Sequence, residues 1–440
     1  MARVSWTLHG DGKQVTPGKV VAPDERLAWP RMASLGLQHV IAMFGATTLV
    51  PVLTGFPVST TLFFSGIGTV MFILITRNRL PSYTGSAFAF IAPVLAAQAD
   101  GGYAAALCGL VAAGIALMVV GVVIDRIGSG MIEKVAPPVV IGTIVAVVGL
   151  NLAGAAYDNF KQDGVVATIT LLVVLGTLVL FRGFISRLAI FMGVLVGYLV
   201  AMGIGKQELD FTAVDEAAWI GLPEFTTPTW SPQAILLIVP AVLVVLVVEN
   251  AAHAKAVGSM CGIDMDPVIG RAVTADGAAT VVSGMFGGTG QVTYAENIGV
   301  MALSRVYSTA AYLFAAAFAI LLSVCPKFGA LVGAVPLGVL GGVSTILFGM
   351  IACMGLRMYV VGNVDFRDPV NLTTAAIGLI IGTANYTWIV GDYEFGGIAL
   401  CSVATIVLYH ALRYTVARRS TDPDVATSGA TEEPGNEPAV

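Results

Sequence analysis

Charged residues are scarce in this chain. Only 11% of its 440 residues are Asp, Glu, Lys or Arg, whereas soluble domains contain about 25%. Hydrophobic residues make up 57% of the chain and glycine adds 51 residues, and the mean hydropathy is +0.87. Too little polar surface is left to cover a water-soluble globule, and this hydrophobicity also excludes intrinsic disorder. The composition predicts a polytopic membrane protein.

Cysteine is also sparse, and its spacing indicates no metal site. The five residues lie far apart, most of them in apolar segments: Cys108, Cys261, Cys325, Cys353 and Cys401. No pair has the spacing of metal ligands, and an odd number gives no disulfide framework. We interpret them as small hydrophobic residues of the interior. The net charge of −5 is small and no block of like charge occurs, so no nucleic-acid partner is expected.

The two ends of the chain are polar. Residues 1–29 contain no apolar run and no small-residue cleavage site, so we expect no cleavable signal peptide. Residues 420–440 are rich in Thr, Pro, Glu and Gly. We expect both ends to be disordered or loosely held.

Long apolar runs fill the rest of the chain. They are continuous rather than alternating at every second residue, which excludes a transmembrane β-barrel. Turn and charge signals divide them into fourteen predicted spans. These are residues 32–52, 59–76, 84–98, 102–124, 136–156, 165–181, 184–203, 232–257, 268–286, 291–304, 306–323, 333–356, 368–388 and 395–415.

The distribution of basic residues predicts the orientation. If both termini are cytoplasmic, 19 of the 22 Lys and Arg residues fall in inner loops and tails. Only Lys161, Lys206 and Lys327 then fall outside. Such a bias is typical of membrane proteins, whose cytoplasmic loops carry an excess of positive charge.

The third and tenth predicted spans are interrupted. Residues 82–90 are short and polar, and residues 287–297 are too polar and glycine-rich for a lipid-facing helix. The two segments lie close to half the chain apart, and residues 66–69 resemble residues 277–280 at a similar offset. We therefore predict two halves of seven spans, inverted because the number is odd, with the interrupted segments lining a substrate site.

Ionisable residues inside apolar spans are the candidates for function, because a charge near the bilayer centre is costly. Glu249 and His253 are four residues apart and share one helix face, and Glu296 lies in the tenth span. The pair Glu249 and His253 could instead only lock two helices together. His39, preceded by Gln38, is either a packed core histidine or a residue behind the site, and Asp276 either caps its helix or orients a neighbour.

The pattern suits recognition of a small polar ring rather than catalysis. No His-Glu-x-x-His, Gly-x-Ser-x-Gly or Walker motif is present, so we expect no enzyme activity, no metal and no cofactor. Two carboxylates can accept hydrogen bonds from ring N–H groups, and backbone N–H groups near Phe88 and Ala295 can donate to ring carbonyls. Phe88 and Tyr294 offer aromatic faces, and a carboxylate beside a histidine can exchange a proton.

Four motifs resemble the uracil-permease branch of the nucleobase–cation symporter-2 (nucleobase–ascorbate transporter) family. They are QHVIAMFGAT at 38–47, GSAFAF at 85–90, ENAAH at 249–253 and TYAENIGVM at 293–301. The resemblance runs from about residue 30 to 415. It implies a core domain (31–130 and 231–330, segments 1–4 and 8–11), a gate domain (131–230 and 331–419, segments 5–7 and 12–14), cytoplasmic tails (1–30 and 420–440) and a homodimer.

The resemblance also implies roles for individual residues. Glu249 and Glu296 would hold the pyrimidine, Phe88 and Ala295 would donate backbone N–H groups, and His253 would assist proton coupling. Tyr294 and Ala46 would shape the pocket. The family commonly has glycine at the position of Ala295, a Thr where Ser304 precedes Arg305, and can have tyrosine at the position of Phe348, a gate contact.

The sequence therefore predicts a symporter that imports uracil with protons across the inner or plasma membrane by alternating access. A xanthine or purine symporter of the same fold and a passive channel for small polar solutes are the alternatives. The expected partners are uracil or a related nucleobase, protons, membrane lipids and a second copy of the chain.

Overall fold

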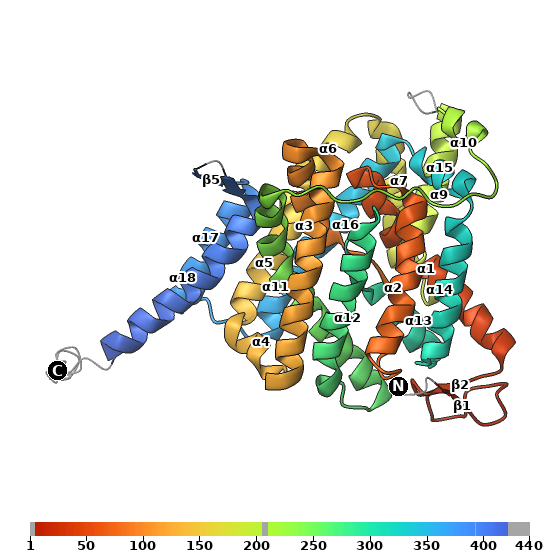
Figure 1. The fold of residues 1–440 in the computed structure, drawn as a ribbon, viewed down its shortest axis with the longest axis horizontal. Helices are drawn as coiled ribbons and strands as arrows, with labels where there is room; N and C mark the ends of the chain where they lie inside the picture. The colour runs from red at the N-terminus through yellow and green to blue at the C-terminus, as the bar shows by residue number, and fades with distance from the viewer. Residues whose placement is uncertain (1–4, 205–209, 392, 421–440) are drawn as a thin grey trace, which may run out of the picture.

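Helices dominate the structure (Figure 1). The computed structural model describes residues 5–204, 210–391 and 393–420. Across these ranges, seven helical stretches are long and apolar enough to span a membrane, or eight if the bent pair Thr309–Ser323 and Pro326–Gly333 forms one span. The predicted helical membrane fold is confirmed at this level. Each of the fourteen predicted ranges contains a helix, but several helices fall short of that criterion, so the number of spans stays a prediction.

The elements follow one another in a simple order. The first half contains β1 (Thr7–Leu8), β2 (Glu25–Arg26), α1 (Trp29–Thr54), α2 (Val58–Ile75), β3 (Thr84–Ser86), the 3-10 turn η1 (Phe88–Phe90), α3 (Ile91–Ile127), α4 (Gly130–Val135), α5 (Pro138–Asn151), α6 (Ala153–Phe160), α7 (Gly164–Leu180), α8 (Phe184–Arg187) and α9 (Ala189–Ile204). The second contains α10 (Thr212–Glu216), α11 (Pro232–Cys261), α12 (Asp266–Met285), β4 (Gln291–Thr293), α13 (Ala295–Ser304), α14 (Thr309–Ser323), α15 (Pro326–Gly333), α16 (Leu337–Val361), α17 (Pro369–Thr383), β5 (Thr387–Val390), β6 (Tyr393–Gly396) and α18 (Gly397–Ser420).

Local sequence signals explain where the long helices begin and end. The hydroxyl of Ser231 accepts the N–H of Ala234 and caps α11, with Pro232 in its first turn. The helix ends at Gly262, whose φ of 67° is left-handed, a conformation that glycine adopts without steric cost. Gly102 has φ 78° and ψ −177°, which breaks α3 into two arms. These arms correspond to the predicted spans 84–98 and 102–124.

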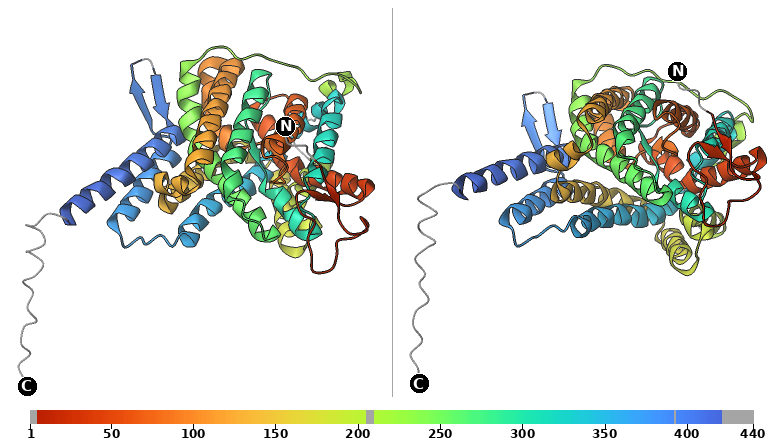
Figure 2. Two further views of the ribbon diagram at one scale, coloured as in Figure 1. Left: turned by 60° about the horizontal axis from the view of Figure 1, so that its bottom comes forward. Right: turned by 90° about the horizontal axis from the view of Figure 1, so that it is seen from below.

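The helices pack as two groups. In one group, α12 packs on α2 and α3, α11 packs on α3, and α14 packs on α1 and α2. In the other, α16 packs on α5, α6 and α7, and α17 packs on α5 and α18. The last helix, α18, leaves the body of the molecule toward the C-terminus (Figure 2).

Glycines allow α3 and α12 to touch through their backbones. A Cβ placed at Gly277 of α12 would lie 2.6 Å from the carbonyl oxygen of Gly114 of α3, and a Cβ at Gly121 would lie 2.7 Å from the oxygen of Gly270. Only residues without a side chain fit at such a crossing, which is how membrane helices approach closely. The contact holds α12, and with it the neighbouring Asp276, in a fixed position.

The expectation of a loosely held N-terminal end is wrong for residues 5–28. The strands β1 and β2 pair in parallel, and Val21 forms a β-bridge with Val306. Val21, Leu27 and Val306 are buried in a small apolar cluster with Ala310. The segment is polar overall, and single apolar residues rather than a continuous run hold it in place. Its composition alone therefore does not predict that it is ordered. Residues 1–4 and 421–440, where the rest of the expectation falls, lie outside the described residues.

Candidate substrate-binding site

The site is built around two short paired strands, β3 and β4, which together form the β3–β4 crossing. The strands β3 and β4 pair antiparallel, with Gly85 opposite Val292 and Thr84 opposite Thr293. The pairing extends by one hydrogen bond at each end, from Ala87 N to Gly290 O (3.0 Å) and from Tyr294 N to Tyr83 O (3.0 Å). The predicted interruptions of the third and tenth segments are therefore confirmed, and each contains an extended stretch.

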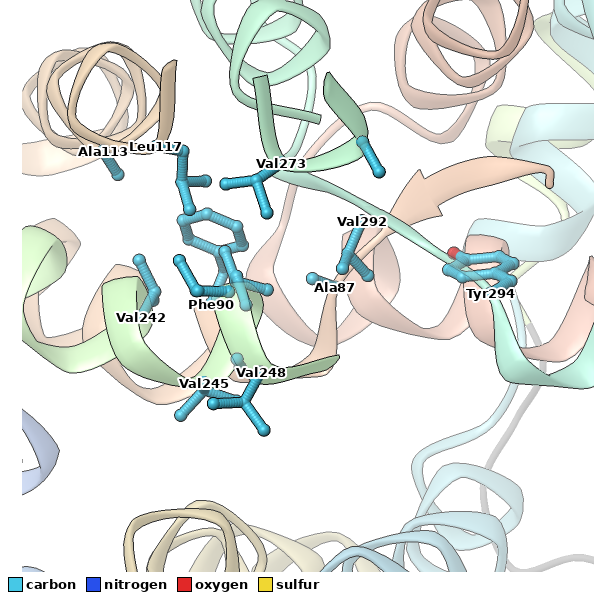
Figure 3. Packing of buried hydrophobic residues seen from close by; sticks show 14 of the residues in the cluster. Ala87, Phe90, Ala113, Leu117, Val242, Val245, Val248, Val273, Val292 and Tyr294 are labelled. Carbon is cyan, nitrogen blue, oxygen red and sulfur yellow. The ribbon is translucent and has the colours of Figure 1, made fainter. Parts of the chain in front are cut away.

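Apolar packing holds this crossing in place. Figure 3 shows the ring of Phe90 among Val242 and Val245 of α11, Val273 of α12 and Leu117 of α3, next to the strand pair. All of these side chains are buried. The crossing is thus fixed against the helices by a dense apolar cluster on one side.

A helix begins directly after each strand. The 3-10 turn η1 starts at Phe88, and α13 starts at Ala295 with Glu296 in its first turn. The first N–H groups of a helix have no partner within the helix, and the helix N-terminus favours electron-rich ligand atoms. Phe88 is half-buried and Ala295 is exposed, so the positions predicted to donate backbone N–H groups are accessible from outside the packed interior.

The two predicted acids are the accessible polar groups beside the crossing. Glu249 and Glu296 are each partly exposed, although their neighbours Asn250 and Asn297 are buried. The carboxyl groups lie close enough to interact electrostatically. Within the part of the chain that the structure describes, neither carboxylate forms a hydrogen bond or ion pair with another residue. Both are therefore available to a ligand.

Asp276 positions the residues next to both acids. Its Oδ2 atom accepts a hydrogen bond from the backbone N–H of Thr293 (2.8 Å) and another from Asn250 Nδ2 (2.9 Å). Asn250 follows Glu249, and Thr293 precedes Glu296 by three residues. Of the two interpretations left open by the sequence, the structure favours the one in which Asp276 orients its neighbours, because both of these bonds lead to other elements rather than to an end of α12.

His253 faces the strand rather than Glu249. Its Nδ1 atom lies 2.9 Å from Thr293 Oγ1, and the side chain is buried. No hydrogen bond joins His253 to Glu249 among the described residues, although the two share one side of α11. The imidazole is therefore connected to the site through β4.

Tyr294 and Ala46 belong to the wall behind the site. The Tyr294 hydroxyl donates to Ser86 O (2.9 Å) and accepts from Thr47 Oγ1 (3.2 Å). The Tyr294 ring packs on Gly85, where a Cβ would lie 2.7 Å from the ring. Tyr294 is only 3% exposed and Ala46 only 1%, so Tyr294 supports β3 from within the packed interior and Ala46 is a buried residue of α1.

His39 fastens α13 to α1. Its Nδ1 atom lies 3.0 Å from Asn297 Nδ2, and its ring lies 4.4 Å from that of Tyr312. His39 is buried, whereas Gln38 is half-buried. Because Asn297 follows Glu296, this contact holds the segment that carries the acid. It agrees with the interpretation of His39 as a residue behind the site.

Phe348 approaches the site from the second group of helices. It is buried in an apolar cluster with Ile91, and the half-buried Phe88 packs on the same cluster. On another side it lines a cavity of about 320 Å³ together with Tyr157. The structure thus brings Phe348 toward Phe88.

Several residues of the site were not singled out from the sequence. The hydrogen-bonding side chains that support it also include Thr47, Ser86, Asn250, Thr293 and Asn297. Each is a polar residue inside one of the four motifs, and a polar side chain within an apolar span needs a partner. That signal was available, but the sequence does not say which partner each residue has.

Two interrupted segments that meet beside accessible carboxylates, inside a bundle of apolar helices, are typical of a membrane transporter. Residues 31–391 match the Xan_ur_permease model, described as the Permease family. The chain belongs to this family and is a transporter rather than an enzyme.

Named relatives and solved structures agree with this assignment. The chain is 40% identical over 406 residues to the uracil permease of Paenibacillus larvae, covering 89% of this chain and 96% of the relative. It is 40% identical over 404 residues to the uracil permease of Escherichia coli K12, covering 89% and 93%. The transmembrane domain of the cyanobacterial bicarbonate transporter BicA has the same fold, with a TM-score of 0.58 at 12% identity over 86% of this chain and 96% of that one.

Proposed function

We propose that this protein is a symporter that imports uracil together with protons across the cell membrane. The observation that carries the proposal is the pair Glu249 and Glu296, two accessible carboxylates beside the β3–β4 crossing that have no protein partner within the described residues. The relatives that are 40% identical over about nine-tenths of the chain are uracil permeases, which supports the choice of substrate.

The chemistry of the site suits a pyrimidine with alternating donors and acceptors. The carboxylates of Glu249 and Glu296 accept hydrogen bonds from the two ring N–H groups. The backbone N–H groups at Phe88 and Ala295, at the two helix starts, donate to the ring carbonyls. The partly exposed ring of Phe88 stacks on the base. A methyl group at Ala295 narrows the site on the side of α13.

Proton coupling is assigned to the same acids with the help of His253. A carboxylate that takes up a proton becomes a hydrogen-bond donor, so protonation changes what the site can bind. His253 reaches the site through Thr293, at 2.9 Å. We propose that the imidazole passes or stabilises the proton while the carboxylates hold the ring.

The architecture that fits this function has fourteen segments in two inverted halves. The two packing groups of helices support a core domain of residues 31–130 and 231–330 and a gate domain of residues 131–230 and 331–419. Both tails lie in the cytoplasm in this proposal, and two copies form a dimer in the inner or plasma membrane. Alternating access then moves the gate against the core around the bound base.

Binding measurements on purified variants test the site. E249Q and E296Q keep the shape but replace an acceptor with a group that is half donor, so each should weaken uracil binding about tenfold or more. E216Q changes an exposed acid at the end of α10, outside the two strands and the helices that carry the acids, and serves as the matched control. Calorimetry that finds the affinity of the unmodified protein in both E249Q and E296Q would contradict the proposal.

Uptake of labelled uracil by vesicles tests the coupling and the substrate. We expect accumulation only with an imposed pH gradient, and its loss when an ionophore dissipates that gradient. Uptake that only equilibrates uracil across the membrane, with or without the ionophore, would identify a passive channel. Uptake of labelled xanthine with which neither thymine nor uracil competes would identify a purine transporter of the same fold.

A further inference from the structure

The side chain of Arg187 lies directly on the backbone of Gly299. A Cβ placed at Gly299 would collide with the Arg187 guanidinium, and its three nearest heavy atoms all belong to Arg187. Arg187 ends α8, in the turn between α7 and α9, whereas Gly299 lies in the middle of α13. Two elements that are distant in sequence therefore meet through one charged side chain and one glycine: α13, which packs on α1 and α11, and α8, which packs on α7.

A second contact of the same kind lies beside the first. Ile190, three residues after Arg187, packs on Gly45 of α1, and the three atoms nearest to a Cβ at Gly45 all belong to Ile190. Arg187 and Ile190, on either side of the α8–α9 turn, thus pack on glycines of two different helices, α13 and α1. A side chain at either glycine would displace the residue that packs on it.

Gly299 places the contact with Arg187 close to Glu296. Gly299 lies three residues after Glu296, so the two share one side of α13 about one turn apart. The helix continues to Ser304, and the carbonyl of Arg305 accepts the backbone N–H of Val21 from the N-terminal segment. Along α13, Arg187 therefore lies between Glu296 and the end of the protein that carries the N-terminal segment.

On the opposite side of the contact, α1 and α9 separate. Beyond Gly45 and Ile190 they line an apolar cavity of about 420 Å³, together with residues of α15. Its lining residues on α1 continue to Val52 and those on α9 to Met202, away from the N-terminal segment. The contact between α1 and α9 is therefore closed at Gly45 and Ile190 and opens toward Val52 and Met202.

We propose that Arg187 is the latch that holds the α8–α9 turn on α13 and closes the substrate path at the end of the protein carrying the N-terminal segment. The guanidinium packs on Gly299, because only a residue without a side chain lets it lie against the helix. Opening of the path at this end then requires Arg187 to leave Gly299. This proposal rests on the proposed transport function only for the identity of the substrate path.

Distance measurements between spin labels test the latch. Labels at Arg182 and Ala302, both exposed residues, flank the contact from either side in a chain whose native cysteines have been replaced. R187A should shift the distance distribution to longer values, because the turn is released. G299A should do the same, because its methyl group displaces the guanidinium. R126A, at an exposed arginine in the last turn of α3, is the control and should change nothing.

The double variant R187A/G299A separates a latch from general damage. Once Arg187 is absent, the methyl group at residue 299 meets no obstacle, so the double variant should match R187A alone. Additive effects, or distances that stay unchanged in both single variants, would overturn the proposal. Uracil binding by calorimetry is measured on the same samples: a chain that fails to bind uracil but shows the expected distances contradicts the proposed substrate and leaves the latch supported.

Discussion

Asp276 accepts the backbone N–H of Thr293 at 2.8 Å, which ties α12 to the strand that leads into the helix of Glu296. The same Oδ2 atom accepts from Asn250, the residue after Glu249. One buried carboxylate thus sets the positions of two segments that each carry an acid of the site. The positions of the two acids therefore depend on a third acid that is itself fully buried.

Substitution of Asp276 should therefore lower the stability of the protein and weaken uracil binding. D276A leaves the Thr293 N–H and the Asn250 amide without their acceptor, and a buried unpaired group costs roughly 1–3 kcal/mol. D276N keeps one oxygen that can accept both bonds, so its effect should be smaller. We expect D276A to lower the thermal unfolding midpoint and to weaken uracil binding at least tenfold. Equal stability of D276A and the unmodified protein would show that Asp276 does not hold the strand.

Removal of the Tyr294 hydroxyl tests the wall of the site. Y294F loses the bond to Ser86 O and the bond from Thr47, and should destabilise the protein by roughly 1–3 kcal/mol because both partners are buried. Y312F is the matched control, since the Tyr312 hydroxyl is fully buried but has no hydrogen-bond partner within the described ranges and little is lost with it. Thermal unfolding of the two variants compares them directly. A larger loss in Y312F would contradict this account.

Substitution of His253 should separate coupling from binding. H253L removes the titratable ring, so uracil accumulation driven by a pH gradient should fall strongly while binding stays measurable. T293V keeps His253 but removes its partner at 2.9 Å, and controls for the loss of the hydrogen bond alone. If H253L abolishes binding in a folded protein, then His253 is a ligand of the base rather than part of the proton path.

Patterns that depend on local sequence were the ones that could be predicted. The apolar runs predicted the helices, and the polar, glycine-rich stretches predicted the interruptions at β3 and β4. The partners across the site could not be predicted, because the pairing of Asp276 with Thr293 and of His39 with Asn297 depends on how α12 and α1 pack. The burial of the N-terminal segment could not be predicted for a similar reason: Val21 becomes buried only when Val306 lies opposite it.

The N-terminal segment should respond to acid through Glu25. Burial works against ionisation of Glu25, but its carboxylate accepts the N–H of Ala22 (3.0 Å) and a hydrogen bond from His9 Nδ1 (2.7 Å). The hydrogen bonds outweigh burial, so the pKa of Glu25 lies below its ordinary value of 4.5. A lowered pKa means that the ionised carboxylate stabilises the packed segment above pH 4.5, and that this stabilisation is lost as the pH falls through the lowered pKa.

Hydrogen exchange of residues 5–28 measures this effect. In the unmodified protein, protection relative to E25Q should be greatest above pH 4.5 and should disappear at lower pH, because the amide introduced by E25Q cannot ionise. D24N changes the exposed acid next to Glu25 and should behave like the unmodified protein. The Glu25 backbone carbonyl also accepts the Ser308 hydroxyl at the start of α14, so release of the segment should extend to the Arg305–Thr309 turn. Equal protection of E25Q and the unmodified protein at neutral pH would show that the carboxylate does not hold the segment.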